Sequence, residues 1–368
     1  MSANRSVVSS AKLIAVCTLV SRITGLARDI LLAQAFGLGW VQDAFSYAFQ
    51  VPNLFRRLFG EGAMAPVFVP TFTRTLEHEG RASAWLLLAR TLALLTVALC
   101  AVIVIIGAII ALVWWVVPVE AAEAPKRHLL LALTATMLPF MLTICVIALL
   151  SAILNCVGSF VPAAFAPVVL NLCMIAGIAA VGPAVTRGLA LNSERYEAVD
   201  ARGGRVTVIG APDGGFEVER SADPGATTSA VYKNLAELRS ADAAAEAAFT
   251  DNRDRALAVK AQAVAVCVVI AGLAQLVFIY PALRANRVTL GWRLELRDPT
   301  VRRMLQLLVP VALGQGVLAF GVFLDAQICW MFSGEHGATS WLGPGFRYPL
   351  EEGALATISL FGKESRAI

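Results

Sequence analysis

Residues 91–117 read TLALLTVALCAVIVIIGAIIALVWWVV and contain no charged residue. An uncharged apolar run of this length exceeds the roughly 20 residues with which an α-helix crosses the hydrocarbon core of a bilayer. Residues 261–281 form a second such run. Because long apolar stretches have no other favourable solvent, these two runs predict membrane-spanning helices and indicate an integral membrane protein.

The composition of the whole chain supports the same class. Of its 368 residues, 58% are hydrophobic and only 15% are charged, and the mean hydropathy is +0.72. Soluble domains carry about 25% charged residues, so this chain lacks the charge to cover a soluble surface. Its apolar content also excludes a disordered chain. The formal net charge is only +4, and the sequence lacks the clustered basic and aromatic surface that nucleic-acid binding requires.

Further apolar stretches extend the prediction to an all-α, polytopic membrane helix bundle. We expect helices over residues 7–28, 30–58, 83–117, 128–156, 160–186, 257–283 and 301–333, and the start of an eighth near 352–362. The first two are weak by hydropathy because they carry charges. Arginines gather between the second and third helices and between the sixth and seventh. The positive-inside rule then places the N-terminus in the cytoplasm.

The predicted domain organisation follows from these helices. Residues 1–187 hold the first five helices, and 188–256 form a polar, net negative insert on the external side. In the insert, alternating runs on both sides of a Pro-Asp-Gly turn predict a β-hairpin, and residues 234–249 predict a short helix. The insert is interpreted as a solvated excursion or, alternatively, as a surface for substrate or partner recognition. The sixth helix (257–283), a basic cytoplasmic loop (284–300), and the seventh helix with a truncated eighth (301–368) complete the chain.

The sequence offers little for covalent or metal chemistry. The seven cysteines are scattered through apolar segments and form no Cys-X-X-Cys pair, which indicates apolar packing rather than metal binding or disulfides. The three histidines, His78, His128 and His336, are far apart. With no nucleophile–base pair and no metal-ligand cluster, we expect no enzyme, no cofactor and no metal site.

Charged residues inside the first two predicted helices are the strongest functional signal. Arg22 and Arg28 lie in the first helix, and Arg56 and Arg57 lie at the end of the second. An arginine at bilayer depth costs at least about 2.5–3.5 kcal/mol, so such residues usually face a cavity or the bundle interior. Several arginines around one cavity would suit a pyrophosphate, because the planar guanidinium binds two oxygens at once. Alternatively, Arg22 and Arg28 snorkel to headgroups, and Arg56 and Arg57 mark topology.

Other polar residues in apolar stretches are candidates for helix pairing. Asp43 is expected to pair with one of these arginines, whereas the neighbours Arg28 and Asp29 are expected not to face the same way. Asn155 and Asn171 suit interhelical hydrogen bonds and substrate contacts equally well. Asp325, in the predicted seventh helix, is a possible polar site because an unpaired carboxylate there would be costly.

Four ordered segments resemble the MurJ/MviN family. Residues 18–29 (TLVSRITGLARD) are similar to the signature of the family's first helix, and 52–62 (PNLFRRLFGEG) to its continuation. Residues 150–155 (LSAILN) and 163–171 (AAFAPVVLN) resemble its fourth and fifth helices. The likeness covers about residues 10–180 well and about 257–335 more loosely, and the insert has no counterpart in the family pattern.

The resemblance implies a lipid II flippase of the MOP exporter superfamily, in the bacterial inner membrane. Such proteins carry undecaprenyl-pyrophosphate-linked muropeptide from the inner to the outer leaflet by alternating access, for peptidoglycan synthesis and cell shape. The implied fold is a MOP/MATE-like N-terminal lobe with about one and a half further helices. The implied partners are lipid II, membrane lipids and cell-wall synthesis proteins. By resemblance, Arg22, Arg28 and Arg56 engage the pyrophosphate in the cavity, while Asp29, Asp43, Arg57 and Glu61 act as gate residues or charge partners.

Two departures from the family pattern bear on function. Only about half of the family's helices are present, and the likeness stops in the predicted eighth helix, where Lys363 lies near the position of a further cavity arginine. We therefore expect a chain truncated after the first lobe, which alone would be inactive. The alternatives to lipid II transport are export of another polyprenyl-linked glycan and a non-transporting membrane scaffold.

Overall fold

The computed structural model describes residues 2–37, 39–58, 64–118, 124–189, 195–199, 205–210, 216–223, 226–233 and 243–295, together with scattered residues between 237 and 324. The chain divides into two compact units, the first comprising Met1–Gly177 with Ala265–Ile368 and the second Ile178–Val264. Glu61, Asp325, the predicted eighth helix and most of the predicted seventh lie outside the described residues.

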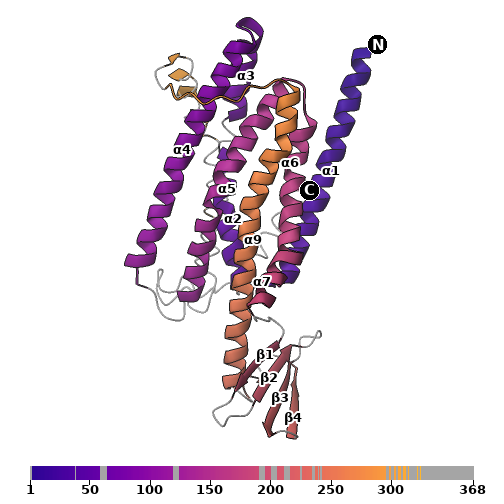
Figure 1. Cartoon of the computed structure of the whole chain (residues 1–368), viewed down its shortest axis with the longest axis vertical. Coiled ribbons are helices and arrows are strands. Elements are labelled where there is room, and N and C mark those ends of the chain that lie inside the picture. Colours follow the sequence, from indigo (N-terminus) through magenta and orange to yellow (C-terminus); the bar gives the residue numbers. More distant parts are fainter. Residues whose placement is uncertain are drawn as a thin grey trace. The chain divides into compact units, whose positions relative to one another are not determined.

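The first unit is a bundle of long helices (Figure 1). Its helices are α1 (Ser2–Phe36), α2 (Trp40–Phe55), α3 (Met64–His78), α4 (Arg81–Val116), α5 (Ala124–Cys156), α6 (Val161–Ala176) and the second half of α9 (Ala243–Ala285). Helix α5 is central, because it packs against α2, α3, α4 and α6, while α1 packs mainly on α6. The core of the unit is therefore built around α5.

Four helical stretches are long and apolar enough to cross a membrane among the residues that the structure describes: Arg81–Val116, Ala124–Cys156, Val161–Gly188 and Phe249–Ala285. The predicted fold class, a polytopic all-α membrane protein with a small sheet, is confirmed. Helix α1 does not join these four, in keeping with its charged residues. Helix α2 has only 16 residues, fewer than the roughly 20 that a perpendicular crossing needs.

The structure corrects two predicted boundaries. The first helix does not stop at residue 28 but continues to Phe36. Gly37 then takes a φ of 68°, a left-handed conformation that suits glycine and ends the helix. Residues 64–78, expected in a loop, form α3. Its buried Phe72 stacks at 5.5 Å from Phe68 and contacts Trp85 of α4 at 5.7 Å between ring centroids. Tertiary packing thus stabilises a helix too short for its hydropathy to predict.

A run of aromatic rings ties three helices together. Phe36 at the end of α1 stacks on Phe45 of α2 with 5.9 Å between ring centroids. Phe45 and Phe49 follow at 6.3 Å, and Phe49 and Phe140 of α5 also lie 6.3 Å apart. Phe45 and Phe140 are almost fully buried. Aromatic pairs at these separations are each worth about 0.5–1.5 kcal/mol beyond the area they bury, so the run fixes α1 and α2 onto the central helix.

Helix α9 packs closely on α5 and α6. A Cβ added at Gly272 would overlap the Thr143 hydroxyl and lie 2.9 Å from Cδ2 of Phe140, so only glycine allows this approach. Gln275, 3% exposed, donates from Nε2 to the carbonyl of Ala166 at 2.7 Å. Small residues and buried amide hydrogen bonds are the usual means by which helices associate where lipid removes the hydrophobic driving force.

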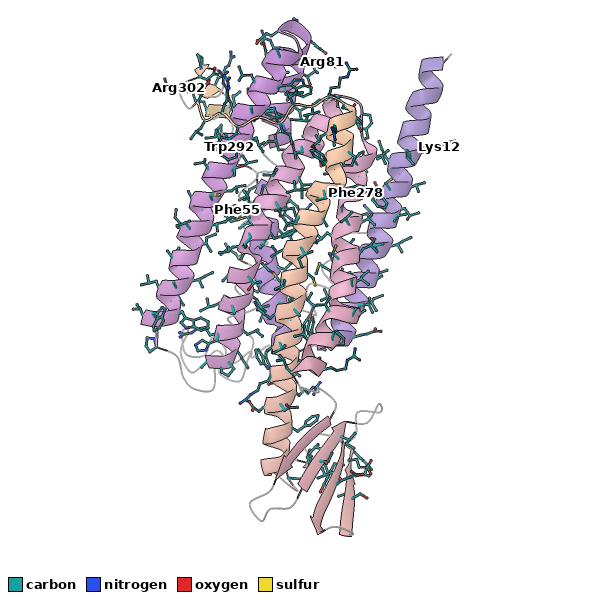
Figure 2. The ribbon with its side chains drawn as sticks, viewed as in Figure 1. Lys12, Phe55, Arg81, Phe278, Trp292 and Arg302 are labelled. Atoms are coloured by element: carbon teal, nitrogen blue, oxygen red, sulfur yellow. The ribbon has the colours of Figure 1, made fainter. Side chains whose placement is uncertain are left out.

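The segment after α9 crosses to α4 (Figure 1). Arg90 of α4 donates from Nε to Glu295 at 2.8 Å and lies 2.7 Å, from Nη1, from Oδ2 of Asp298. The backbone N–H of Arg293 also reaches the carbonyl of Ala89 at 3.5 Å. Trp292, on the same segment, is exposed (Figure 2). The predicted basic loop is thus held to α4 by ion pairs in which Arg90 supplies the positive charge.

The second unit contains a four-stranded antiparallel sheet. Its strands, β1 (Arg195–Val199), β2 (Arg205–Gly210), β3 (Phe216–Asp223) and β4 (Ala226–Tyr232), pair in sequence order. The pairing of β2 with β3, from Arg205↔Ser221 to Gly210↔Phe216, confirms the predicted hairpin. A small core packs beneath it, made of Val208, Val218, Leu238, Phe249 and the partly buried Tyr232.

Other features of the second unit differ from the prediction. Strands β1 and β4 were not expected. The predicted short helix over 234–249 does not end there, because from Ala243 onward the chain is already in α9, which continues without a break to Ala285.

The predicted fifth helix also has a different form. Helix α6 passes through a short π-helical segment, Gly177–Val181, into α7 (Gly182–Gly188). Its glycines and Pro183 favour this irregularity.

Candidate functional site

Arg28 of α1 lies at the centre of a hydrogen-bonded network between two apolar helices. Its Nε and Nη2 donate to Oδ1 of Asp29 at 3.0 and 2.7 Å, and its Nη1 donates to Oδ1 of Asn171 on α6 at 2.9 Å. The Arg28 and Asp29 side chains are only 14% and 17% exposed. The network therefore holds an ion pair largely inside the helix bundle. The attraction between the two charges offsets part of the cost of removing them from water.

Asn171 completes the network by clasping the backbone of α1. Its amide donates from Nδ2 to the carbonyl of Ser21 and to Oγ1 of Thr24, each at 3.2 Å. A Cβ placed at Gly25 would lie 3.5 Å from the same nitrogen, so α1 approaches α6 closely here. Asn171 is only 5% exposed. Its position between Arg28 and α1 shows that it joins the two helices, one of the two roles that the sequence left open.

The hydrogen-bond inventory of Arg28 defines what the site can still do. A guanidinium has five N–H donors, and the contacts with Asp29 and Asn171 use three of them. One N–H on each terminal nitrogen remains for a further acceptor. Two donors on the terminal nitrogens of a planar group match the geometry with which arginine binds phosphate oxygens. The arrangement can thus accept an anion without breaking its existing contacts.

The expectation that Arg28 and Asp29 face apart is wrong. Their Cα–Cβ bonds point about 100° apart on a helix with 3.6 residues per turn, but the long arginine side chain bends back to its neighbour's carboxylate, 2.7 Å away. Helical spacing constrains where a side chain begins, and a long flexible side chain reaches well beyond it.

The structure does not gather all the predicted arginines around Arg28. Arg22 lies on the exposed face of α1, among apolar side chains such as Leu19, Ile23 and Leu26, which are 58%, 59% and 63% exposed. Arg28 and Arg22 are six residues apart, about 240° around the helix. The two arginines therefore occupy different parts of the α1 surface.

The remaining predicted residues lie on and just after α2. Asp43 is buried, at 1% exposure, in the first turn of that helix. Arg56 follows the helix and is partly buried, close enough to Cys145 of α5 for its charge to act on the thiol, whereas Arg57 is exposed. Helix α2 packs chiefly on α5, and Arg56 lies near that helix.

Asn155 and Asn171 had the same two predicted roles, but the structure places them in different surroundings, and this difference can be tested. Asn171→Ala removes bonds to Arg28, Thr24 and the Ser21 carbonyl, so we expect a loss of about 1–2 kcal/mol in the stability of the bundle. Asn155→Ala is the matched control, because Asn155 is exposed on α5 and should change stability by less than about 0.5 kcal/mol. Thermal unfolding in detergent measures both. Equal melting temperatures for the two variants would contradict the bridging role.

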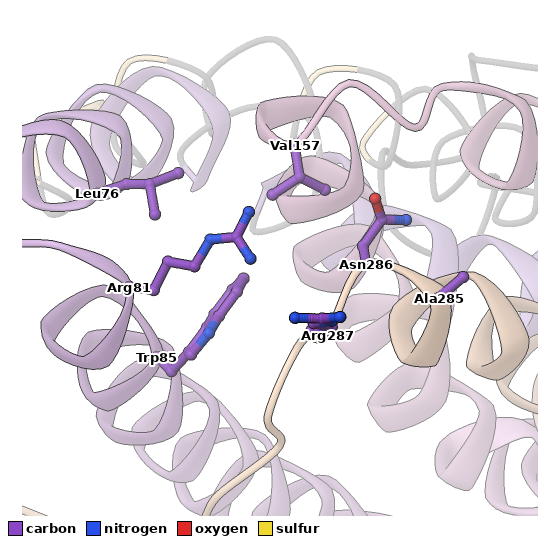
Figure 3. A pocket seen from close by; sticks show the side chains of 7 residues that line it. All are labelled: Leu76, Arg81, Trp85, Val157, Ala285, Asn286 and Arg287. Carbon is purple, nitrogen blue, oxygen red and sulfur yellow. The ribbon is translucent and has the colours of Figure 1, made fainter.

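A pocket apart from this network was not anticipated from the sequence. Its volume is about 470 Å³, and it is lined by Leu76, Arg81, Trp85, Val157, Ala285, Asn286 and Arg287 (Figure 3). These residues come from the ends of α3, α4, α5 and α9. From the sequence alone, Arg81 and Arg287 are interpreted as ordinary markers of membrane topology. The only signal that could have suggested more is Trp85, which follows Arg81 by one helical turn.

The fold and the network define a polytopic membrane protein that holds a charged, hydrogen-bonded site inside its helix bundle. Comparison with known proteins agrees with the family suggested by the sequence. The model of the family described as "Lipid II flippase MurJ" matches residues 32–197, which include Asp43 and Arg56 and begin after Arg28.

Three relatives illustrate the similarity. The chain is 30% identical to a probable lipid II flippase MurJ of Rhizobium tropici over 327 residues, which are 88% of this chain and 48% of the relative. It is 39% identical to the lipid II flippase MurJ of Burkholderia cenocepacia over 170 residues, covering 45% and 32% of the two chains. A probable lipid II flippase MurJ of Bdellovibrio bacteriovorus is 37% identical over 179 residues, with 46% and 33% covered.

The resemblance to the MurJ/MviN family is therefore confirmed. The chain spans about half the length, or less, of the curated relatives it matches.

Proposed function

We propose that this chain forms part of a flippase for lipid II, the lipid-linked peptidoglycan precursor, and binds its pyrophosphate through Arg28. The observation that carries the proposal is the buried network of Arg28, Asp29 and Asn171, which leaves two guanidinium donors for an anion. The likeness to proteins named as lipid II flippases supplies the substrate class. The protein is thus a transporter that moves its substrate without making or breaking covalent bonds.

The position of Arg22, exposed on α1 among apolar side chains, supports a water-filled path beside this helix. In contact with lipid tails, an exposed arginine in the middle of an apolar helix costs at least about 2.5–3.5 kcal/mol. That cost disappears if the exposed face of α1 borders a water-filled cavity. We therefore place the substrate path beside α1, passing Arg22 on its exposed face and Arg28 on the side that contacts α6. Arg56, just after α2, is the third cationic residue of the path.

Asp29 stabilises the site when no substrate is bound. In the absence of an anion, the carboxylate of Asp29 compensates Arg28, as the 2.7 Å ion pair indicates. A pyrophosphate carries more negative charge and more acceptor oxygens, and it binds the two guanidinium donors that Asp29 and Asn171 leave open. Because Asp29 keeps its contact with Arg28, the charge of Arg28 stays compensated when the substrate leaves. The polyprenyl chain of the substrate stays in lipid, because a long hydrocarbon gains nothing from a charged cavity.

Orientation and location follow from the charge distribution. Arginines cluster around the end of α3, the start of α4 and the segment after α9, and include Arg74, Arg81, Arg284, Arg287 and Arg293. Loops rich in arginine remain in the cytoplasm during insertion. We propose a bacterial inner-membrane protein with a cytoplasmic N-terminus, which places the 188–256 insert outside. Asp43 and Arg57 act as charge partners near the substrate path.

The test is rescue of a bacterium depleted of its own lipid II flippase. A chimaera carries this chain in place of the matched 48% of the Rhizobium tropici relative, so that the remaining helices are supplied. We expect growth to be restored and lipid II to reach the outer leaflet. A chimaera that inserts into the membrane but leaves lipid II in the inner leaflet would overturn the proposal. Rescue of a strain lacking a different polyprenyl-linked glycan exporter, without lipid II transport, would assign another glycan.

A further inference from the structure

The pocket at the ends of α3, α4, α5 and α9 has the size of a ligand site. Its volume of about 470 Å³ lies within the range of roughly 300–1,000 Å³ that is typical of small-molecule sites. Figure 3 shows the side chains of Arg81 and Trp85 of α4 beside one open space, with Arg287, just past the end of α9, across it. Arg22, Arg28 and Arg56 do not line it, so it is distinct from the substrate site proposed above.

The two arginines of the pocket carry charge that the described residues do not compensate. Within that part of the chain, neither the Arg81 nor the Arg287 side chain has an ion pair or a hydrogen bond. Contrast Arg90, a few residues along α4, which is paired with both Glu295 and Asp298. Both guanidinium groups are exposed to solvent, and an anion lying between them would lower their mutual repulsion. The pocket therefore has the electrostatics of an anion site.

The backbone at Arg287 strengthens this inference. Arg287 has a φ of 54° and is the one non-glycine residue with a positive φ among those the structure describes. It lies just past the end of α9, where its N–H donates to the Arg284 carbonyl and the Val288 N–H donates to Leu283. This position usually takes glycine, since a side chain there is strained. Arg287 nevertheless occupies this position and lines the pocket.

The apolar part of the lining indicates the kind of anion. Leu76, Trp85 and Val157 form the rest of the wall, and the pocket lies where α4 begins and where α5 and α9 end. Those helices are candidate membrane spans, so their ends lie at the depth of lipid headgroups. Tryptophan is enriched at this depth because its ring is both apolar and polar. A ligand with an anionic phosphate and an adjoining apolar part fits both halves of the lining.

We propose that this pocket binds a phosphate group, that of an anionic membrane phospholipid, between Arg81 and Arg287, with Trp85 against the glycerol and upper acyl region. The shared chemistry is phosphate recognition by two arginine forks. The apolar wall favours the lipid over a free phosphate ion.

The test is native mass spectrometry of the full chain released from detergent with phosphatidylglycerol or phosphatidylcholine added. We expect one phosphatidylglycerol to be retained preferentially. Arg81→Ala and Arg287→Ala should each weaken its retention by about tenfold or more, as expected for loss of a charge-assisted contact. Arg284→Ala is the matched control, because it removes an arginine from the same end of α9 without altering the pocket lining. In a parallel arm, inorganic phosphate is titrated and the thermal stability of the protein is followed.

The outcomes separate the sources of the phosphate. Selective retention of phosphatidylglycerol that is lost in the two pocket variants and kept in Arg284→Ala supports the proposal. Stabilisation by inorganic phosphate that depends on Arg81 and Arg287, without selective lipid retention, overturns the lipid assignment and leaves a soluble phosphate as the ligand. Equal retention of both lipids with no effect of phosphate, or equal losses in pocket and control variants, overturns the anion site itself. None of these readings depends on transport activity.

Discussion

Arg28→Ala in the chimaeric flippase is expected to abolish the rescue of growth, while the protein still inserts into the membrane. Arg28 supplies the two free N–H donors for the pyrophosphate, and charge-assisted hydrogen bonds are each worth about 1.5–3 kcal/mol. Losing two of them weakens substrate binding by at least about a hundredfold. The variant also removes the ion pair that Arg28 makes with the carboxylate of Asp29, 2.7 Å away in the wild-type protein. Growth on depletion of the host flippase, with membrane-fraction immunoblotting, measures the effect.

Three further variants distinguish loss of binding from loss of folding. Arg28→Lys keeps the charge but loses the planar fork, so we expect partial rescue. The double variant Arg28→Ala with Asp29→Ala removes both charges of the ion pair and should recover stability without recovering transport. Arg293→Ala, at an exposed arginine, should rescue as the wild-type chain does. Full rescue by Arg28→Ala would refute the assignment of Arg28 to the substrate.

Gly272→Ala is expected to lower the stability of the helix bundle strongly, although it adds only one methyl group. The new Cβ would overlap Oγ1 of Thr143 and lie 2.9 Å from Cδ2 of Phe140. Phe140 is fully buried, and the Thr143 hydroxyl already donates to the Phe140 carbonyl at 2.9 Å. Neither can move freely, so α9 must shift away from α5. Overpacking of this kind costs about 1–3 kcal/mol.

Gly107→Ala is the matched control, because Gly107 is also helical but has nothing within 4 Å of an added Cβ. In that open position, alanine gains up to about 1 kcal/mol of helix propensity. The two substitutions should therefore move the midpoint of thermal unfolding in detergent in opposite directions. Adding Thr143→Ala to Gly272→Ala removes the overlapping hydroxyl and should restore part of the loss. Equal midpoints for Gly272→Ala and Gly107→Ala would show that α9 does not pack on α5 as described.

The class of fold could be predicted from the sequence because it depends on local properties. An uncharged run such as residues 91–117 requires a membrane wherever it packs, and the turn between β2 and β3 is encoded within a few residues. Helix α3 could not be predicted, since its stability comes from Phe72 packing on Trp85 of another helix. The predicted end of α1 at residue 28 was also wrong. The sequence contains no helix-breaking residue there, and the glycine that ends the helix, Gly37, lies further on.

The candidate site was partly predictable for a similar reason. Arg28 stands out in any hydropathy profile, since a charge in an apolar helix demands an explanation. Its partner Asn171 could not be told from Asn155 by sequence, because their difference lies in which neighbour each one faces. The pocket formed by Arg81 and Arg287 joins segments far apart in the chain. Each of these arginines alone is indistinguishable from a topology marker.

The central claim is that this chain binds lipid II through Arg28, and direct binding tests it most simply. The purified full chain is mixed with lipid II and examined by native mass spectrometry, beside Arg28→Ala and the pocket variant Arg81→Ala. We predict that the wild-type chain and Arg81→Ala retain one lipid II molecule and that Arg28→Ala loses it. Absence of lipid II from the wild-type chain, or equal retention by Arg28→Ala, would contradict the account.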